Sequence, residues 1–254
     1  MVTNWLITGD THAQCARFDS IDKTLYPPDS TAIIILGDGG NNYYLDVRDT
    51  KLKRTMARLG YLFYFVRGNH EARPEDIPSM ELVYDDLVQG MIYYEREFPT
   101  LHYFVDGETY HIDGRRTLVL GGAYSVDKQY RLLRGWQWFS NEQLSKEEQE
   151  KIYNNLSNEI VYDLVLSHTC PLSWEPRELF LSMIDQSTVD DSMEKWLERV
   201  EQKIDYNFWL FGHFHGNKIV NDNAAMLFDE IVDLSMVQPI DKYTDIPENF
   251  YRTI

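Results

Sequence analysis

The stretch Val66-Arg67-Gly68-Asn69-His70-Glu71 follows an apolar run that begins at Tyr61 and predicts a buried strand. Glycine tolerates φ values that other residues avoid, so we expect the backbone to turn sharply at Gly68. The turn would set an amide and an imidazole side by side at the rim of a sheet. The same order of apolar run, glycine and ligand-type side chains recurs in Gly9-Asp10-Thr11-His12, Gly37-Asp38 and Gly212-His213-Phe214-His215. Together these stretches predict one two-metal centre.

Hydrophobic runs between turn residues predict the order of the strands. Strands over 4–8, 31–36 and 61–66, with a helix over 46–59, give the first 70 residues a β-α-β-α-β order. Later strands are expected at 103–105, 109–112, 117–120, 160–166, 208–211, 218–220, 225–228 and 231–234. The ligand-type side chains all follow strand C-termini, which is the edge where open α/β sheets form their sites.

Three more helices are expected from the spacing of apolar residues. The segment 76–99 is expected to be mostly helical. The segment 140–156 has Ser140 as its candidate N-cap, with a glutamine three residues later. The segment 179–204 has Asp190 as a candidate cap for its second part.

Composition bounds the class of protein. The chain has 254 residues, of which 43% are hydrophobic and 14% aromatic, enough for a large packed core. No repeat, low-complexity run or linker stands out, so we expect one domain over 1–254, with the polar tail from Pro239 wrapping the surface. The net charge of −17 argues against a protein that grips long nucleic acid, because such binding needs clustered lysine and arginine.

The sequence also indicates where the protein works. No run approaches the roughly 18 apolar residues that a membrane helix requires, and Trp5 to Thr8 lead straight into the first motif without a signal peptide. The two cysteines, Cys15 and Cys170, do not make a disulfide framework and fit a reducing cytosol. We therefore expect a cytoplasmic protein without a membrane partner, whose oligomeric state the sequence does not indicate.

The ligand types indicate which metals would bind. A carboxylate with two oxygens can bridge two ions, which suits Asp38. Asp10 and His12 are two residues apart, as are His213 and His215, so each pair can face one ion from an extended segment. The mixed nitrogen and oxygen set favours Mn, Fe or Zn over the all-oxygen shells of Ca or Mg.

Gly9-Asp10-x-His12, Gly37-Asp38, Gly68-Asn69-His70-Glu71, His168 and Gly212-His213-x-His215 together resemble the motif series of the calcineurin-like metallophosphoesterase superfamily, in the family's order. The motifs span residues 9–215. The resemblance implies an α/β fold with two packed mixed β-sheets flanked by helices, a four-layer α-β-β-α sandwich, with a dinuclear metal site at the C-terminal ends of the strands.

The resemblance also implies roles for single residues. One divalent ion would be held by Asp10, His12, Asp38 and His215, and the other by Asp38, Asn69, His168 and His213. A hydroxide shared by the two ions would attack phosphorus in line. His70 follows a ligand but is one residue out of phase with it, so it would contact the phosphate and protonate the leaving oxygen.

The chain departs from the family pattern after Gly37-Asp38. The family usually has Gly-Asp-x-x-Asp, followed by arginine in the protein phosphatase branch, and here Asn41 and Asn42 stand at those two positions. The missing aspartate is the one expected to pair with the catalytic histidine. Asn41 can accept a hydrogen bond from that ring, but it stabilises an imidazolium less well than a carboxylate does.

The segment 124–138 is rich in Tyr, Trp and Arg and follows a strand that ends in two glycines. Arg131 and Arg134 are candidate phosphate contacts, and Tyr124 is a candidate for stacking on a base. Packing of these aromatics into the core is an equal alternative. Arg67 is as well suited to a structural ion pair as to a phosphate contact. Inserts at 124–158 and 171–205 are candidates for shaping the substrate site.

These observations favour a metal-dependent phosphodiesterase acting on a small phosphate ester, for which a nucleotide is a candidate. A phosphoprotein or phosphomonoester phosphatase is the first alternative, and the missing arginine weighs against its protein phosphatase branch. A catalytically weak member used as a binding platform is the second. Only the asparagine at position 41 points to that reading, because every expected ligand type is present.

Overall fold

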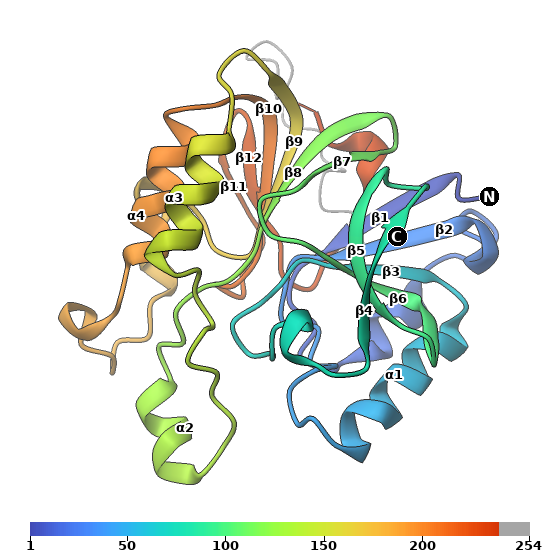
Figure 1. Ribbon diagram of the computed structural model, residues 1–254, viewed down its shortest axis with the longest axis horizontal. Coiled ribbons are helices and arrows are strands. Elements are labelled where there is room, and N and C mark those ends of the chain that lie inside the picture. Colours follow the sequence, from blue (N-terminus) through green and yellow to red (C-terminus); the bar gives the residue numbers. More distant parts are fainter. Residues whose placement is uncertain (239–254) are drawn as a thin grey trace.

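The computed structural model describes residues 1–238, and their strands form two sheets that pack face to face (Figure 1). The expected tail from Pro239 lies outside the described residues. The seven strands of the first sheet, in spatial order, are β13 (Ile231–Asp233), β1 (Asn4–Thr8), β2 (Thr31–Ile35), β3 (Leu62–Phe65), β6 (Phe98–Phe104), β5 (Gly90–Glu95) and β4 (Met80–Asp85). Those of the second are β11 (Lys218–Asn221), β12 (Ala224–Met226), β10 (Asp205–Phe211), β9 (Val161–Ser167), β8 (Arg115–Leu120) and β7 (Thr109–Ile112).

The middle of each sheet is parallel and its edges are antiparallel. In the first sheet β1, β2, β3 and β6 run parallel, and in the second β8, β9, β10 and β12 do. The run Ile33-Ile34-Ile35 in β2 is fully buried, as its β-branched composition without polar alternation predicts. Both parallel sets therefore bring their C-terminal ends to shared edges, where the predicted ligands follow them.

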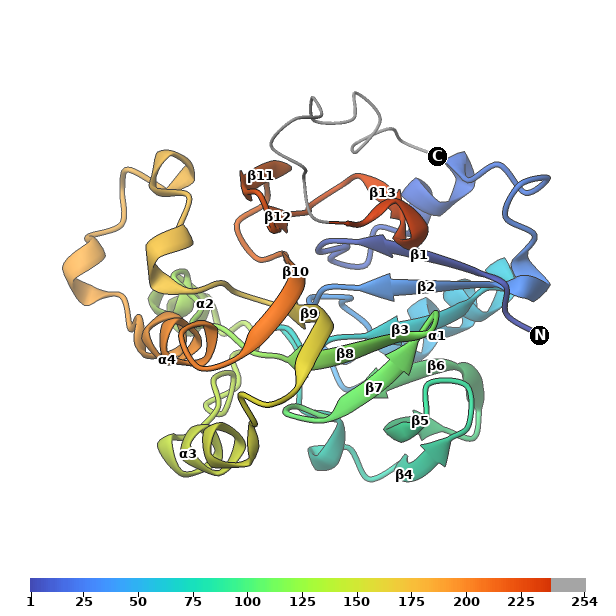
Figure 2. The ribbon, with the colours of Figure 1, turned by 90° about the horizontal axis from the view of Figure 1, so that it is seen from above.

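Helices cover the outer faces of both sheets and make the four layers (Figure 2). Between the sheets, one core joins β1, β2 and β3 to β9 and β10, with Ile34 and Leu210 among its members. The helix α1 (Val47–Leu59) and the 3₁₀ helix Cys15–Ser20 pack on the first sheet. The helices α3 (Lys146–Asn155) and α4 (Ser192–Glu201) pack on the second. The expected α-β-β-α sandwich is confirmed.

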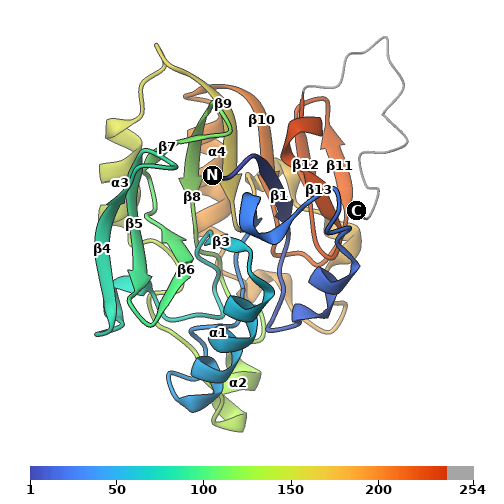
Figure 3. The ribbon, with the colours of Figure 1, turned by 90° about the vertical axis from the view of Figure 1, so that its right-hand side faces the viewer.

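The helix α1 begins and ends as its sequence predicts. The Asp46 side chain accepts a hydrogen bond from Arg48 N, and Gly60 ends the helix with φ of 83°. The helix α2 (Lys128–Arg134) lies within the aromatic segment and projects beyond the sheets (Figures 1 and 3). Among residues 1–238, no helix has the length and apolarity needed to cross a bilayer.

The expectation of a mostly helical segment over 76–99 is wrong. This segment forms the hairpin of β4 and β5, preceded by the 3₁₀ helix Pro74–Asp76. Gln89 turns the chain between the strands with φ of 53°. The apolar spacing that mimics a helix is divided between two strands and their turn. The tyrosines and β-branched residues of both strands favour a sheet more strongly.

Two other helix predictions are wrong in their bounds. The helix α3 is capped by Ser145, not Ser140, because Ser145 and Glu148 form a reciprocal capping box. Of the segment 179–204, only α4 is α-helical, and the part before it holds the short 3₁₀ helices Arg177–Leu179 and Gln186–Thr188. Asp190 Oδ1 does accept a hydrogen bond from Ser192 N, at 3.0 Å, at the start of α4.

Candidate metal centre

The predicted ligands come together where the two sheets meet. Loops after β1, β2 and β3 supply Asp10 and His12, Asp38, and Asn69 and His70, and loops after β9 and β10 supply His168, His213 and His215. Possible ligand atoms lie within 4.8 Å of one another in three overlapping groups: Asp10, His12 and His215; His12, Asp38 and His70; and Asp10, Asp38 and His168. The closest imidazole pair is His12 and His215, whose Nε2 atoms are 2.8 Å apart.

Asp10 and Asp38 are each oriented by the backbone. Oδ1 of Asp10 accepts a hydrogen bond from His213 N, and Oδ1 of Asp38 accepts one from His70 N, both at 2.8 Å. Their Oδ2 atoms face imidazole nitrogens instead. Asp10 Oδ2 lies 3.4 Å from His215 Nε2, and Asp38 Oδ2 lies 3.7 Å from His168 Nε2. Each carboxylate therefore keeps one oxygen directed at the cluster.

Burial and the imidazoles set the protonation of this cluster. Burial alone raises the pKa of Asp38, but the nearby His70 and His168 outweigh it, and the pKa falls below its ordinary value. The pKa of Asp10 is lowered in the same way, with burial opposed by His168 and by the adjacent imidazole of His215. Burial, with a smaller contribution from His168, lowers the pKa of His213 to about 3. Anionic carboxylates and a neutral imidazole are the forms that bind cations.

Asn69 and His168 are held by partners behind them. His168 Nδ1 donates to Leu36 O at 2.7 Å, which leaves Nε2 facing Asn69 Oδ1 at 2.7 Å. The Asn69 amide nitrogen donates to Ser125 Oγ at 2.8 Å, and Ser125 in turn donates to Glu142. Such partners orient ligands without touching the ion. Sequence reasoning missed Ser125 and Glu142, because nothing local marks two residues that a loop packs behind a ligand.

Three of the glycines that precede candidate ligands make room for a candidate ligand from another loop. A Cβ on Gly68 would lie 2.0 Å from Asp38 Oδ1, and one on Gly212 would lie 2.4 Å from Asp10 Oδ1. A Cβ on Gly37 would lie 2.1 Å from His168 Nδ1. The expectation that Gly68 serves a special backbone turn is wrong, since its φ is not positive. Close approach of a ligand is what excludes a side chain there.

Several ligands themselves hold a left-handed backbone conformation. His12, Asp38, His213 and His215 have φ of 43°, 50°, 68° and 53°. Non-glycine residues rarely adopt these values, and such strain persists only where the surrounding structure fixes it. Here the strained backbone conformations belong to the residues whose side chains converge.

The donor set fits two divalent cations. Asp10 Oδ2 is buried and has no hydrogen-bond partner among residues 1–238, although it points at imidazole nitrogens. An unpaired buried carboxylate oxygen is costly unless something cationic satisfies it. His213, whose ring centroid lies 5.0 Å from that of His168, extends the set on the side of Asn69. A cation would satisfy these acceptors together.

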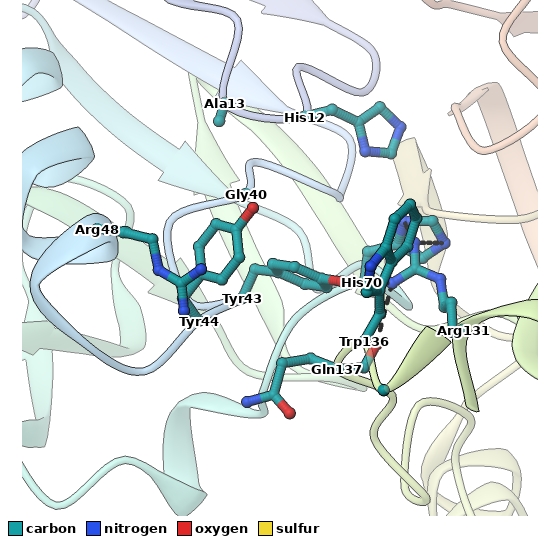
Figure 4. A pocket seen from close by; sticks show the side chains of 11 residues that line it. His12, Ala13, Gly40, Tyr43, Tyr44, Arg48, His70, Arg131, Trp136 and Gln137 are labelled. Atoms are coloured by element: carbon teal, nitrogen blue, oxygen red, sulfur yellow. Dashed lines mark hydrogen bonds between the residues drawn. The ribbon is translucent and has the colours of Figure 1, made fainter. Parts of the chain in front are cut away.

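His70 lies at the mouth of the cluster against Arg131 and Asp127. The Arg131 guanidinium is 2.6 Å from His70 Nδ1 (Figure 4). It also pairs with Asp127 at 2.7 Å. Asp127 Oδ1 lies 3.7 Å from His70 Nε2 and has no hydrogen-bond partner among the described residues. Burial lowers the pKa of His70, while Asp38 opposes this effect. Arg131 is thus brought to the site as predicted, and Asp127 was missed.

The other candidate substrate contacts are dispersed. The Arg67 side chain is buried and bound to Asp106, Gly121 O and Glu142 O, so the structure uses it as an ion-pair residue and not as a phosphate contact. Arg134 is exposed and lies over the ring of Tyr130.

Asn41 and Tyr124 also differ from each other in their surroundings. The amide of Asn41 is fully buried, with no hydrogen-bond partner among residues 1–238. Within residues 1–238, no hydrogen bond between Asn41 and His70 replaces the one that the family pattern implies at this position. Tyr124 lines a cavity beside His213.

Comparisons with known proteins agree with this geometry. The family model described as calcineurin-like phosphoesterase matches residues 4–217. A search of curated proteins finds no match. One crystal structure is 13% identical, with 94% of this chain and 97% of that chain covered and a TM-score of 0.52, which shows the fold alone.

Two further solved structures resemble the chain less closely. The protein TT1561 of Thermus thermophilus is 14% identical, with coverage of 94% and 97% and a TM-score of 0.47. Phosphopantetheinyl hydrolase from Mycobacterium tuberculosis is 12% identical, with coverage of 89% and 88% and a TM-score of 0.43. Because the family model spans most of the sequence and its motifs converge in space, the chain belongs to the calcineurin-like phosphoesterases and is a metal-dependent phosphoester hydrolase.

Proposed function

We propose that this protein is a phosphodiesterase that acts on a small substrate with a planar group, such as a nucleotide. One ion would be held by Asp10, His12, Asp38 and His215, and the other by Asp38, Asn69, His168 and His213. The nitrogen and oxygen donors support Mn, Fe or Zn. When bound, the two ions supply an ionised water and neutralise charge on the phosphate.

His70 serves as the general acid. Its ring lies between the carboxylate of Asp38, with Nδ1 and Oδ2 3.7 Å apart, and that of Asp127. As the ester bond breaks, His70 gives its proton to the leaving oxygen. Asp127 then has the role of the aspartate that the family has at the position of Asn41, because its carboxylate stabilises the imidazolium. Arg131 holds a nonbridging phosphate oxygen beside His70.

The observation that carries the proposal is a cavity of about 570 Å³ at the mouth of the metal cluster. Its volume lies within the range of small-molecule sites. His12, His70 and Arg131 line its inner part, and Tyr43 and Trp136 are among its aromatic walls (Figure 4). An arginine beside flat rings suits a phosphate joined to a planar group.

Two alternatives are less well supported. A protein phosphatase would use an arginine at position 42, where this chain has a buried asparagine. A binding platform would not need ligands held in strained conformations around an unpaired carboxylate oxygen. The two cysteines are unpaired, which supports the proposal of a reducing compartment such as the cytosol.

The test compares two substrates on metal-stripped protein reconstituted with Mn²⁺. Bis-p-nitrophenyl phosphate reports diester hydrolysis, and p-nitrophenyl phosphate reports monoester hydrolysis. We expect turnover of the diester, abolished by chelator and restored by metal. Turnover of the monoester alone would replace the proposal with a phosphatase. Absence of turnover on both substrates with two ions bound would favour the binding platform.

A further inference from the structure

A second cavity, of about 320 Å³, adjoins the metal centre on the side of His213 and His215. Both predicted ligands line it, so the cavity reaches the side chains that would hold the ions. The rest of its wall is mostly apolar and consists of Val126, Leu179, Phe180, Leu181, Ile184, Val189 and Phe214. The mechanism proposed above uses none of these side chains.

The apolar wall is joined directly to the ligands. Phe214 lies between His213 and His215 in the chain, and its ring centroid is 4.8 Å from that of His213. On its other side, Phe214 stacks on Phe180 at 6.1 Å. Phe180 belongs to the segment between β9 and α4, which crosses over the C-terminal edge of the second sheet. A group bound against Phe180 is therefore held next to the metal ligands.

Charge argues against an anionic or a cationic occupant. No lysine or arginine is among the described residues that line this cavity, so it does not suit a second phosphate. Its carboxyl groups already have partners within the protein. Glu194 accepts the Thr169 hydroxyl at 2.7 Å, and Asp190 accepts hydrogen bonds from Ser192 and Gln143. Glu175 lies 3.7 Å from the guanidinium of Arg177, and the surface that remains is mostly apolar, at Leu181 and its neighbours.

We infer that this cavity binds an apolar arm of the substrate, an alkyl chain esterified to the phosphate. The inference rests on the proposed diesterase function. A diester has two arms, and two unlike cavities meet at the ligand cluster: His12 lines one and His215 the other, with their Nε2 atoms 2.8 Å apart. The substrate would place its planar arm beside Arg131 and its alkyl arm beside Phe180.

The test uses a series of p-nitrophenyl alkyl phosphates with methyl, butyl, hexyl and octyl arms, on the Mn²⁺-reconstituted protein. The leaving group is the same throughout, so the alkyl arm is the only variable. Each methylene that leaves water should lower KM by up to about fourfold. We expect kcat/KM to rise with chain length until the cavity is filled.

Two variants in the same segment test whether the effect of chain length depends on this cavity. Leu181 lines the cavity and is 54% exposed, whereas Met183 is 85% exposed and does not line it. Leu181→Asp should lower kcat/KM for the octyl ester far more than for the methyl ester. Met183→Asp, which adds the same charge nearby, should leave the whole series unchanged.

A binding measurement makes the inference independent of turnover. Octyl phosphate should bind the metal-loaded protein at least tenfold more tightly than methyl phosphate in calorimetric titrations. Equal kcat/KM across the series, or equal affinity for the two monoesters, would overturn the apolar-arm site while leaving diester hydrolysis intact. Absence of turnover on every diester would instead overturn the proposed function.

Discussion

Replacing Gly68 with alanine would test whether close approach holds the carboxylate of Asp38 in place. The new Cβ would lie 2.0 Å from Asp38 Oδ1 and 2.3 Å from Asp38 N, whereas ordinary contact begins at 3.4 Å. The oxygen must therefore retreat by about 1.4 Å. Rotation of the Asp38 side chain alone does not relieve the contact with the backbone nitrogen. The hydrogen bond from His70 N to the same oxygen would also be lost.

This shift is large enough to abolish most turnover. Misplacement of a catalytic group by about 1 Å costs on the order of 10² in rate. Asp38 would also serve both ions, so the metal content should fall below that of the wild-type protein. We would measure bound metal by mass spectrometry and kcat on bis-p-nitrophenyl phosphate. Two bound ions and a wild-type kcat in Gly68→Ala would refute the reasoning.

Gly114→Ala supplies the matched control. Its Cβ would meet no atom within 4 Å, but its φ is +73°, so the substitution strains the backbone without a clash. That strain costs roughly 1–2 kcal/mol of stability. The control should unfold at a lower temperature by circular dichroism and still keep its metal and its kcat. It separates a general loss of stability from the specific loss expected at Gly68.

Three further outcomes are expected. His70→Asn should keep both metals and lose about 10²- to 10⁴-fold in kcat, and a wild-type rate would remove His70 from the mechanism. Asp127→Asn should lower kcat more for an alkyl leaving group than for p-nitrophenolate, which needs little protonation, and an equal loss on both would contradict its action through His70. Burial raises the pKa of Glu194 from its ordinary 4.5 to about 7, so the folded state keeps this proton up to a higher pH than the unfolded chain does. The free energy of unfolding should therefore fall by about 3 kcal/mol as pH rises from 4.5 to 7, and urea denaturation of Glu194→Gln at pH 5 and pH 8 should lack that fall.

The convergence of the candidate ligands could be predicted from the sequence because their signals are local. Each lies just after a buried strand, in all cases but His168 behind a glycine, and parallel strands bring such ends together. Asp10 and Asp38 lie in the cluster for this reason. The reason for a glycine at position 68 could not be predicted in the same way. The group that excludes a side chain there is the carboxylate of Asp38, thirty residues earlier in the chain.

The groups behind and beside the ligands depend on tertiary packing. Ser125 orients Asn69, and Asp127 faces His70, only because the segment after β8 folds back over the first sheet's loops. The hairpin of β4 and β5 was missed for a related reason. Apolar spacing over a short segment does not distinguish one helix from two strands, and pairing with β6 decides the outcome.

The division of the ligands between the two sheets has a consequence for folding. Asp10, Asp38 and Asn69 follow strands of the first sheet, and His168 and His215 follow strands of the second. The residues of one sheet alone would therefore not complete the coordination of an ion. Cation binding would thus be linked to the docking of the two halves, with a saturating ion adding about 2.7 kcal/mol at a hundredfold excess over its Kd. An ion bound between the two sheets would hold them together. Its release would be an early sign that the sheets had begun to separate.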